Sequence, residues 1–156
     1  MLKNKFPISY PKVKDFFEAL RAEEGSTLPV GAAGFCWGGK HTINLAHGEK
    51  SSSGKNLIDA GFTAHPSNLE IPAELEKVTL PLAIAHAEKD YTINAQKLQV
   101  IRETLEKLND VDTEVVEYAG ATHGFGVRAN PTKDEGKQSI EAEEQAVRWF
   151  QKHFKS

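Results

Sequence analysis

Short apolar runs alternate with helix-like segments along the whole chain, and this alternation constrains the fold more than any other feature. The apolar runs are rich in small and β-branched residues, which is typical of buried strands. The strands are predicted at residues 28–35, 58–64, 80–86 and 113–118. The helices are predicted at residues 11–24, 38–47, 72–77, 94–108 and 138–154. Strands that alternate with helices predict an α/β fold with a mainly parallel sheet flanked by helices.

The helical segments place apolar residues at the i, i+3, i+4, i+7 spacing of one helix face. These residues are therefore expected to face the core. In the first predicted helix they are Val13, Phe16, Phe17 and Leu20, and in the fourth Leu98, Ile101, Leu105 and Leu108. In the last they are Ile140, Ala146, Val147, Phe150 and Phe154.

Length, composition and charge exclude several classes of protein. The 156 residues suit one domain over 1–156, with 39% hydrophobic and 26% charged residues. A net charge of −3 argues against nucleic-acid binding. No long apolar run predicts a membrane span, and the first residues do not resemble a signal peptide. A single cysteine, Cys36, forms no internal disulfide, so we expect a reducing, cytoplasmic location.

Three chemically capable residues each follow a predicted strand. Cys36 follows the first strand, Asp90 the third and His123 the fourth. Because the carboxyl ends of parallel strands meet at one edge of a sheet, we expect these side chains to lie together. A nucleophile, an acid and a histidine in this chain order match a catalytic triad for acyl transfer, with cysteine as the nucleophile.

The segment around Cys36 has the pattern of a sharp strand-to-helix turn. Gly34 and Gly38 flank the cysteine, and small residues suit a turn where strand and helix approach closely. A helix N-terminus and a protonated histidine both favour the thiolate of a nearby cysteine. The backbone N–H of Trp37 is the expected donor to an oxyanion formed on attack.

Several stretches resemble the dienelactone hydrolases of the α/β-hydrolase superfamily, most closely their fungal branch. They are PKVKDFFEAL, VGAAGFCWGGK, AGFTAHPS, LPLAIAHAEKD, THGFGVR and EQAVRWFQKHF. The resemblance implies that Cys36 is the nucleophile, His123 the general base and Asp90 the residue that orients it. It also implies hydrolysis of small-molecule esters or lactones through an acyl-thioester, with no cofactor.

The chain also departs from this family. Members are longer, and the extra length precedes the region matched here, so we expect the N-terminal strands of the family sheet, a second oxyanion donor and part of the pocket to be absent. The strand at 28–35 would then lie at a sheet edge, where we expect homo-oligomer formation or strand pairing. Arg128 lies one residue beyond the place where bacterial members bind a substrate carboxylate. Arg128 and His65 are tentative substrate-binding residues.

Other interpretations stay open from the sequence. Cys36 could be an inert buried thiol, Glu88 could replace Asp90, and His65 could simply end a strand. The chain could be a binding module that keeps the fold without the activity. The glycines do not fit the G-x-G-x-x-G pattern of dinucleotide binding. A metal site is a further alternative, with candidate ligands Cys36, His65, His86, Asp90 and His123.

Overall fold

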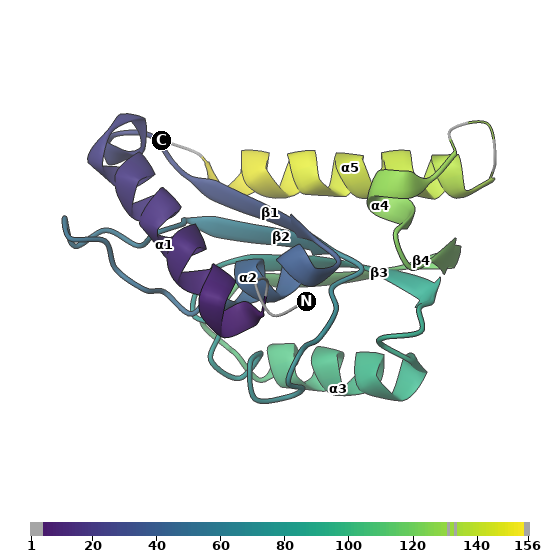
Figure 1. The fold of residues 1–156 in the computed structure, drawn as a ribbon. Helices are drawn as coiled ribbons and strands as arrows, with labels where there is room; N and C mark the ends of the chain where they lie inside the picture. The colour runs from purple at the N-terminus through teal and green to yellow at the C-terminus, as the bar shows by residue number, and fades with distance from the viewer. Residues whose placement is uncertain (1–4, 131, 133, 155–156) are drawn as a thin grey trace.

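The computed structural model describes residues 5–130, 132 and 134–154 of the chain (Figure 1). Its sheet contains β1 (Gly31–Phe35), β2 (Ala60–Ala64), β3 (Leu82–Lys89) and β4 (Thr113–Thr122), in that spatial order. All three strand pairings are parallel. The helices are α1 (Phe6–Ala22), α2 (Trp37–Leu45), α3 (Ala95–Glu106), α4 (Phe125–Arg128) and α5 (Asp134–His153), with a 3₁₀ turn at Glu24–Ser26. The predicted α/β fold with a parallel sheet is confirmed.

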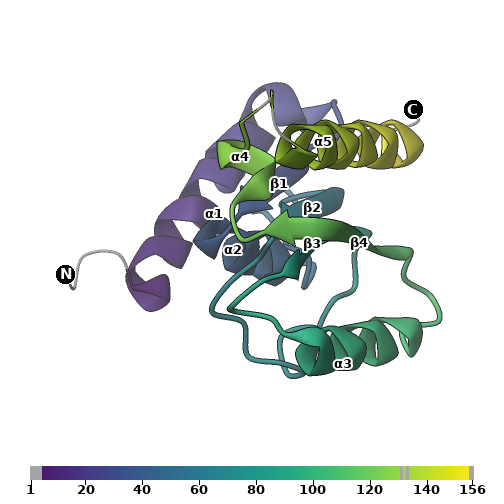
Figure 2. The same cartoon turned by 90° about the vertical axis from the view of Figure 1, so that its right-hand side faces the viewer.

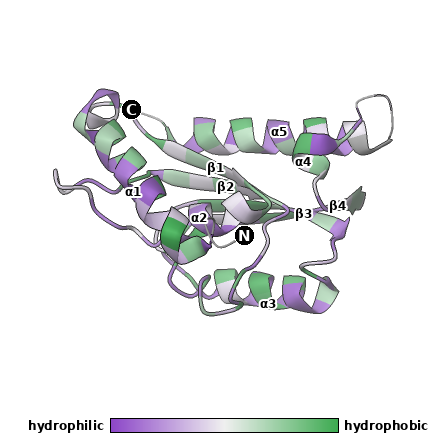
Figure 3. Cartoon of the chain, viewed as in Figure 1, coloured by the Kyte–Doolittle hydropathy of each residue, from purple (hydrophilic) through white to green (hydrophobic). Residues whose placement is uncertain are grey.

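The two faces of the sheet carry separate hydrophobic clusters. In Figure 2, α4 and α5 lie on one side of the sheet, and α3 lies on the other. Side chains alternate along each strand, so Leu82 and Ile84 of β3 join the cluster that includes α1, α2 and α3. Ala83 and Ala85 join the cluster that includes α4 and α5. In Figure 3, α3 and α5 carry both hydrophilic and hydrophobic residues along their length, as amphipathic cover does.

Two of the predicted helices differ from the structure. Residues 71–77 form consecutive turns, in which the N–H groups of Leu75 and Glu76 both donate to the carbonyl of Pro72. The first helix begins at Phe6 with a proline at its start, and Pro11 lies inside it. A proline in the first turn suits a helix because its missing N–H would be unpaired there, and Pro7 fills this place where Pro11 was expected. The short α4 has no counterpart in the sequence prediction.

The apolar faces of two helices were also partly misplaced. Phe16 is 62% exposed, while its neighbour Phe17 is buried. In α5, Ile140 and Val147 are about half exposed, at 54% and 49%. The buried face of α5 instead includes Ala142, Gln145 and Trp149, at the i, i+3, i+7 spacing. The predictions for Leu98, Ile101 and Leu105 of α3 are confirmed, because all three are buried.

An ion pair between the buried Arg21 and the partly exposed Asp59 lies next to the start of β1. The Arg21 guanidinium, 3% exposed, donates to Asp59 Oδ2 at 2.7 Å and to carbonyls of the neighbouring loops. The same Asp59 oxygen accepts the N–H of Val30 at 2.7 Å, directly before β1. Within the described residues β1 pairs only with β2, so its other side is a sheet edge. No described helix is long and apolar enough to span a membrane.

Candidate active site

Cys36 lies at the turn between β1 and α2 in a left-handed backbone conformation, with φ 51° and ψ −121°. Its N–H donates to the carbonyl of Ala64 at 3.3 Å. Its own carbonyl accepts the N–H groups of Gly39 at 3.1 Å and Ser67 at 3.0 Å. An L-residue in this region is strained, and such strain persists only where the surroundings fix the backbone. The turn therefore holds the thiol in one place beyond the end of β1.

Two glycines allow α2 to lie close to the sheet, Gly34 of β1, which faces α2, and Gly39 of α2, which faces β2. A Cβ at Gly34 would lie 2.3 Å from Thr42 Oγ1 and 2.4 Å from the carbonyl oxygen of Gly38. A Cβ at Gly39 would lie 2.3 Å from Thr63 Oγ1. At Gly38, in contrast, a Cβ would meet nothing within 4 Å. Gly34 meets the steric expectation for the turn, whereas Gly39 is the crowded position in the helix and Gly38 is not.

Asp90 and His123 form a hydrogen-bonded pair beyond β3 and β4. Asp90 Oδ2 accepts from His123 Nδ1 at 2.9 Å, and both side chains are almost fully buried. Asp90 Oδ1 accepts the N–H and the hydroxyl of Thr92, each at 2.7 Å. Burial alone would raise the pKa of Asp90, but the bonds from Thr92 and His123 outweigh it and lower that pKa. Asp90 is therefore an ionised acceptor that fixes the His123 ring.

Thr92 is a site residue that sequence reasoning missed. An aspartate followed two residues later by a residue whose N–H and hydroxyl return to the carboxylate is a common turn signal. The D-x-T spacing of Asp90 and Thr92 carried this signal. The structure also distinguishes Asp90 from the other candidate acid, Glu88. Glu88 is exposed and accepts the N–H of Gly120 instead.

His65 lies directly against the thiol. Its Nδ1 is 3.3 Å from Cys36 Sγ, its side chain is fully buried, and its φ of 40° is again left-handed. Burial, and then the nearby His123, lower the pKa of His65 to about 4, so its imidazole is neutral at physiological pH. Its Nε2 has no hydrogen-bond partner among the described residues. His65 is thus a buried neighbour of the Cys36 thiol, and no longer only a strand-ending residue.

The thiol and the two imidazoles form one group. Cys36 Sγ and one ring nitrogen each of His65 and His123 lie within 4.8 Å of one another. The ring of His65 packs edge-on against that of His123, with centroids 5.1 Å apart. His86 and Asp90, the other candidate metal ligands from the sequence, are not members of this group.

Aromatic rings surround this group. Trp37, at the start of α2, packs edge-on against His41 with ring centroids 4.3 Å apart. The Tyr91 ring lies 4.8 Å from that of His123 and is 83% exposed. The backbone N–H of Trp37 has no acceptor among the described residues, as an oxyanion donor would require.

Arg128 closes the short helix α4 near the site. Its guanidinium lies against Gly124, where a Cβ would come within 2.4 Å of the Arg128 nitrogen. Gly124 follows His123 directly and has a φ of 99°. The charge of Arg128 contributes to the lowered pKa of His65, after burial and His123. The arginine is therefore close enough to His65 to act on it electrostatically.

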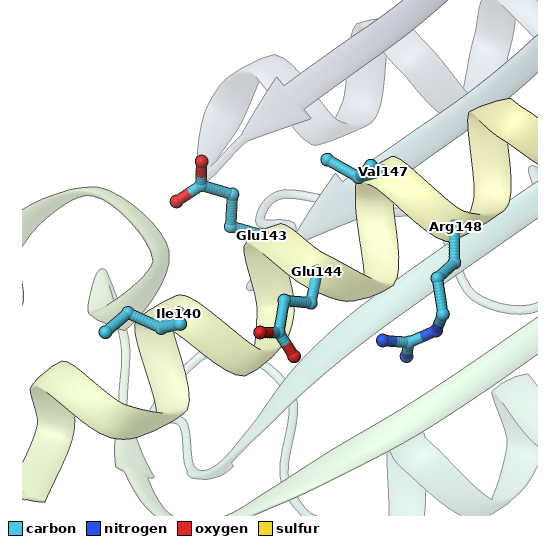
Figure 4. Close-up of a pocket in the computed structure, with 5 residues that line it drawn as sticks. All are labelled: Ile140, Glu143, Glu144, Val147 and Arg148. Atoms are coloured by element: carbon cyan, nitrogen blue, oxygen red, sulfur yellow. The ribbon is translucent and has the colours of Figure 1, made fainter.

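The cavities lie at different distances from the candidate catalytic residues. A groove of about 470 Å³ follows the outer side of α5 and is lined by Ile140, Glu143, Glu144, Val147 and Arg148 (Figure 4). It includes none of the candidate catalytic residues. A smaller pocket of about 190 Å³ lies between β1 and α5 and includes Phe35, the residue before Cys36, and Gly126. This smaller pocket therefore adjoins the turn that carries Cys36, whereas the groove on α5 does not.

Comparisons with known proteins agree with the fold and the motifs. The model of the dienelactone hydrolase family matches residues 9–154. Hydrolase tropI of Talaromyces stipitatus is 37% identical over 128 residues, which are 81% of this chain and 46% of that protein. A carboxymethylenebutenolidase homolog of Xenopus tropicalis is 27% identical over 136 residues, which are 85% of this chain and 52% of that protein. The chain spans about half the length of these relatives.

Solved structures share the fold at low sequence identity. The thermophilic esterase Est2 of Thermogutta terrifontis superposes with a TM-score of 0.73 at 15% identity. The match covers 96% of this chain and 67% of the esterase chain.

Proposed function

Because the chain belongs to the dienelactone hydrolase family, we propose that it hydrolyses ester or lactone bonds of small molecules, with Cys36, Asp90 and His123 as its catalytic residues. The printed names of its relatives, a hydrolase and a carboxymethylenebutenolidase homolog, support this class of reaction. Since the chain spans about half of those proteins, the proposal concerns the chemistry that this part of the fold can carry.

The first step is acyl transfer to the thiol. His123 accepts the Cys36 proton while the sulfur attacks the carbonyl carbon, and the carbonyl electron pair moves onto oxygen. The N–H of Trp37, which has no acceptor among the described residues, donates to this oxyanion. When the intermediate collapses, the alkoxide leaves with the proton held by His123, and a thioester on Cys36 remains.

The second step is hydrolysis of the thioester. His123 removes a proton from a water molecule, which attacks the thioester carbonyl, and the thiol leaves with that proton. Asp90 accepts the Nδ1–H of His123 at 2.9 Å in both steps, so it stabilises the imidazolium and keeps Nε2 free for proton transfer. No cofactor is needed, because the nucleophile and the base are both side chains.

His123 suits the role of base better than His65, although His65 lies closer to the sulfur. A pKa of about 4 makes His65 a weak proton acceptor at neutral pH. His123 is oriented by an ionised carboxylate, and its ring nitrogen is within 4.8 Å of Sγ. In unliganded enzymes the contact between base and nucleophile is often long or poorly aligned, and it shortens when substrate binds.

The proposal depends most on one observation. The Asp90–His123 pair lies next to a thiol held in a strained turn at the start of α2. Arg128, beside Gly124, supplies a positive charge near the site, which favours substrates with a carboxylate. Thiolates attack activated esters and lactones more productively than amides, because an amine leaves less readily than the thiolate.

The test is hydrolysis of p-nitrophenyl acetate by the chain, with mass spectrometry to detect an acetyl adduct on Cys36. We expect Cys36→Ala to abolish both turnover and adduct. We expect Asp90→Asn to lower the rate roughly 100- to 10,000-fold, because the His123 ring loses its ionised partner. Glu88→Gln is the matched control, since this exposed carboxylate is two residues away and does not contact His123.

Each outcome has a distinct meaning. An adduct without turnover would mean that the thiol is reactive but deacylation is incomplete in this chain. A folded sample with neither activity nor adduct would contradict the proposal and favour a binding module that keeps only the fold. A rate that survives Cys36→Ala would assign the chemistry to another group.

A further inference from the structure

The proposed hydrolysis leaves His65 unexplained, although its Nδ1 lies 3.3 Å from the thiol. We propose that Cys36, His65 and His123 form a binding site for a soft divalent cation such as Zn²⁺, and that the bound ion blocks the nucleophile. The three ligand atoms lie within 4.8 Å of one another. Among the residues that the structure describes, this is the one such group of three potential ligands.

The donor set and its spacing fit zinc. One thiolate and two imidazoles are ligands that Zn²⁺ prefers, with Zn–S near 2.3 Å and Zn–N near 2.0–2.1 Å. In a tetrahedral site these bond lengths place the ligand atoms about 3.5 Å apart. The 3.3 Å between Cys36 Sγ and His65 Nδ1 already meets this spacing. The group needs only about 1 Å of side-chain movement to close around an ion.

Groups behind the ligands are arranged as in known zinc sites. Zinc-bound histidines commonly donate their second ring N–H to a carboxylate, which fixes the ring and strengthens it as a ligand. Asp90 accepts the Nδ1–H of His123 at 2.9 Å, so Nε2 is the nitrogen that faces the site. Asp90 is itself held by two hydrogen bonds from Thr92.

His65 supplies the second imidazole through Nδ1. Its side chain is fully buried, and its Nδ1 lies 3.3 Å from Cys36 Sγ. Coordination through Nδ1 would replace the weak contact with the thiol by a metal bond and leave the ring proton on Nε2. The ring then stays neutral, as a metal-bound histidine must be.

The consequence is reversible inhibition. Binding releases the Cys36 proton to solvent and forms a metal–sulfur bond, and the ion also occupies the ring nitrogen of His123. This part of the inference rests on the proposed function, since it assigns the nucleophile and the base to these two residues. Three protein ligands leave a fourth position for water or a small anion.

Cobalt titration of the full chain, purified with a chelator and then freed of it, tests the site without requiring activity. Co²⁺ bound by a thiolate in a tetrahedral site gives a sulfur-to-metal absorption in the near ultraviolet and strong bands in the visible. We expect both at one ion per chain, with displacement by Zn²⁺. We expect Asp90→Asn to weaken binding roughly 10- to 100-fold, and Cys36→Ser and His65→Asn to weaken it further.

The matched control is His47→Gln. His47 lies just beyond α2, and its Nε2 pairs with the carbonyl of Glu74, outside the group. This variant should bind Co²⁺ as the parent does. Circular dichroism of each variant verifies folding, and Asn tolerates the left-handed backbone of residue 65. A folded parent chain without the thiolate band, or undiminished binding by Cys36→Ser, would overturn the metal site.

Ester hydrolysis in the presence of Zn²⁺ separates this inference from the proposed function. If Zn²⁺ inhibits hydrolysis, a chelator reverses the inhibition and the cobalt signal is present, the metal site and the proposed hydrolase function are both supported. A cobalt signal in a chain without hydrolase activity would support the metal site and contradict the proposed function. Activity that saturating Zn²⁺ leaves unchanged removes the metal inference and keeps the hydrolase.

Discussion

Two residues with side chains that touch each other, Cys36 and His65, both adopt left-handed backbone conformations, with φ of 51° and 40°. Strain at adjacent positions of a candidate site is costly, and the surrounding hydrogen bonds must impose it. The GFCWGG stretch predicted the turn at Cys36, because glycines beside a nucleophile have a local steric meaning. It did not predict the conformation of His65, which depends on contacts from distant parts of the chain.

The turn makes a prediction about its glycines. Gly34→Ala should destabilise the chain by about 1–3 kcal/mol or more, since its Cβ would meet the backbone of Gly38 and the hydroxyl of Thr42. Gly38→Ala should be neutral or stabilising by up to about 1 kcal/mol, because its Cβ enters open space in a helix. Urea unfolding of both variants checks this. Equal losses of stability would contradict the steric assignment.

At the scale of elements, periodicity predicted which helices and strands exist better than it predicted their faces. The α3 stripe was correct because leucines and isoleucines dominate one side. Part of the α5 stripe was correct, because Ala146, Phe150 and Phe154 pack against the core. The rest was misplaced, since Ile140 and Val147 are exposed while Ala142 and Trp149 are buried. Apolar residues occur on more than one side of α5, so the face that becomes buried depends on how the helix packs against the sheet. The turns at 71–77 follow from contacts that a short window does not contain.

The edge of β1 predicts self-association. β1 pairs only with β2 within the described residues, and Ala33 and Phe35 are exposed along it. An unpaired edge with apolar side chains favours pairing with a second chain. We expect the average mass in sedimentation equilibrium to rise with concentration. Ala33→Lys should reduce this rise, because a lysine on an edge strand opposes pairing.

Val100→Lys is the control for the edge variant. Val100 is similarly exposed but lies on α3, away from β1. It should leave the association unchanged. A parent chain that keeps the monomer mass at every concentration would show that the β1 edge is not an interaction surface in this chain.

For the molecule as a whole, the order of strand ends was enough to predict which residues meet. Parallel strands place Cys36, Asp90 and His123 at one edge of the sheet, and the structure brings two of them into a hydrogen bond. The alternation of strands and helices therefore predicted a parallel sheet and the edge at which these three residues lie. The sequence did not indicate that His65 would contact the thiol more closely than His123, because that distance depends on how the loops pack.

Buried histidines make global stability depend on pH. The folded pKa of His65 is about 4 and its unfolded pKa about 6.5, so the unfolded chain binds the proton first. The stability that comes from keeping His65 neutral is therefore fully present above pH 6.5 and is lost as the pH falls toward 4. Burial lowers the pKa of His86 in the same direction. Between pH 7.5 and 5, His65 alone should cost about 2 kcal/mol of unfolding free energy.

Urea unfolding at these two pH values measures the loss, and His65→Asn should make the difference between them smaller by about that amount. Asn does not titrate and accepts the left-handed backbone, so the comparison isolates the proton. An unchanged pH dependence in this variant would assign the loss of stability to other groups.

Trp37 directly follows Cys36 in the chain, and its ring packs against that of His41. Its fluorescence can therefore report on the surroundings of the thiol. The chain has two tryptophans, and the other, Trp149, packs against His153 on the far helix. Indole emission is quenched by a protonated imidazole and responds to charge in its surroundings. In a Trp149→Phe variant the remaining emission comes from Trp37, next to Cys36, so the arrival of an acyl group or an ion at this thiol could be followed by fluorescence in real time.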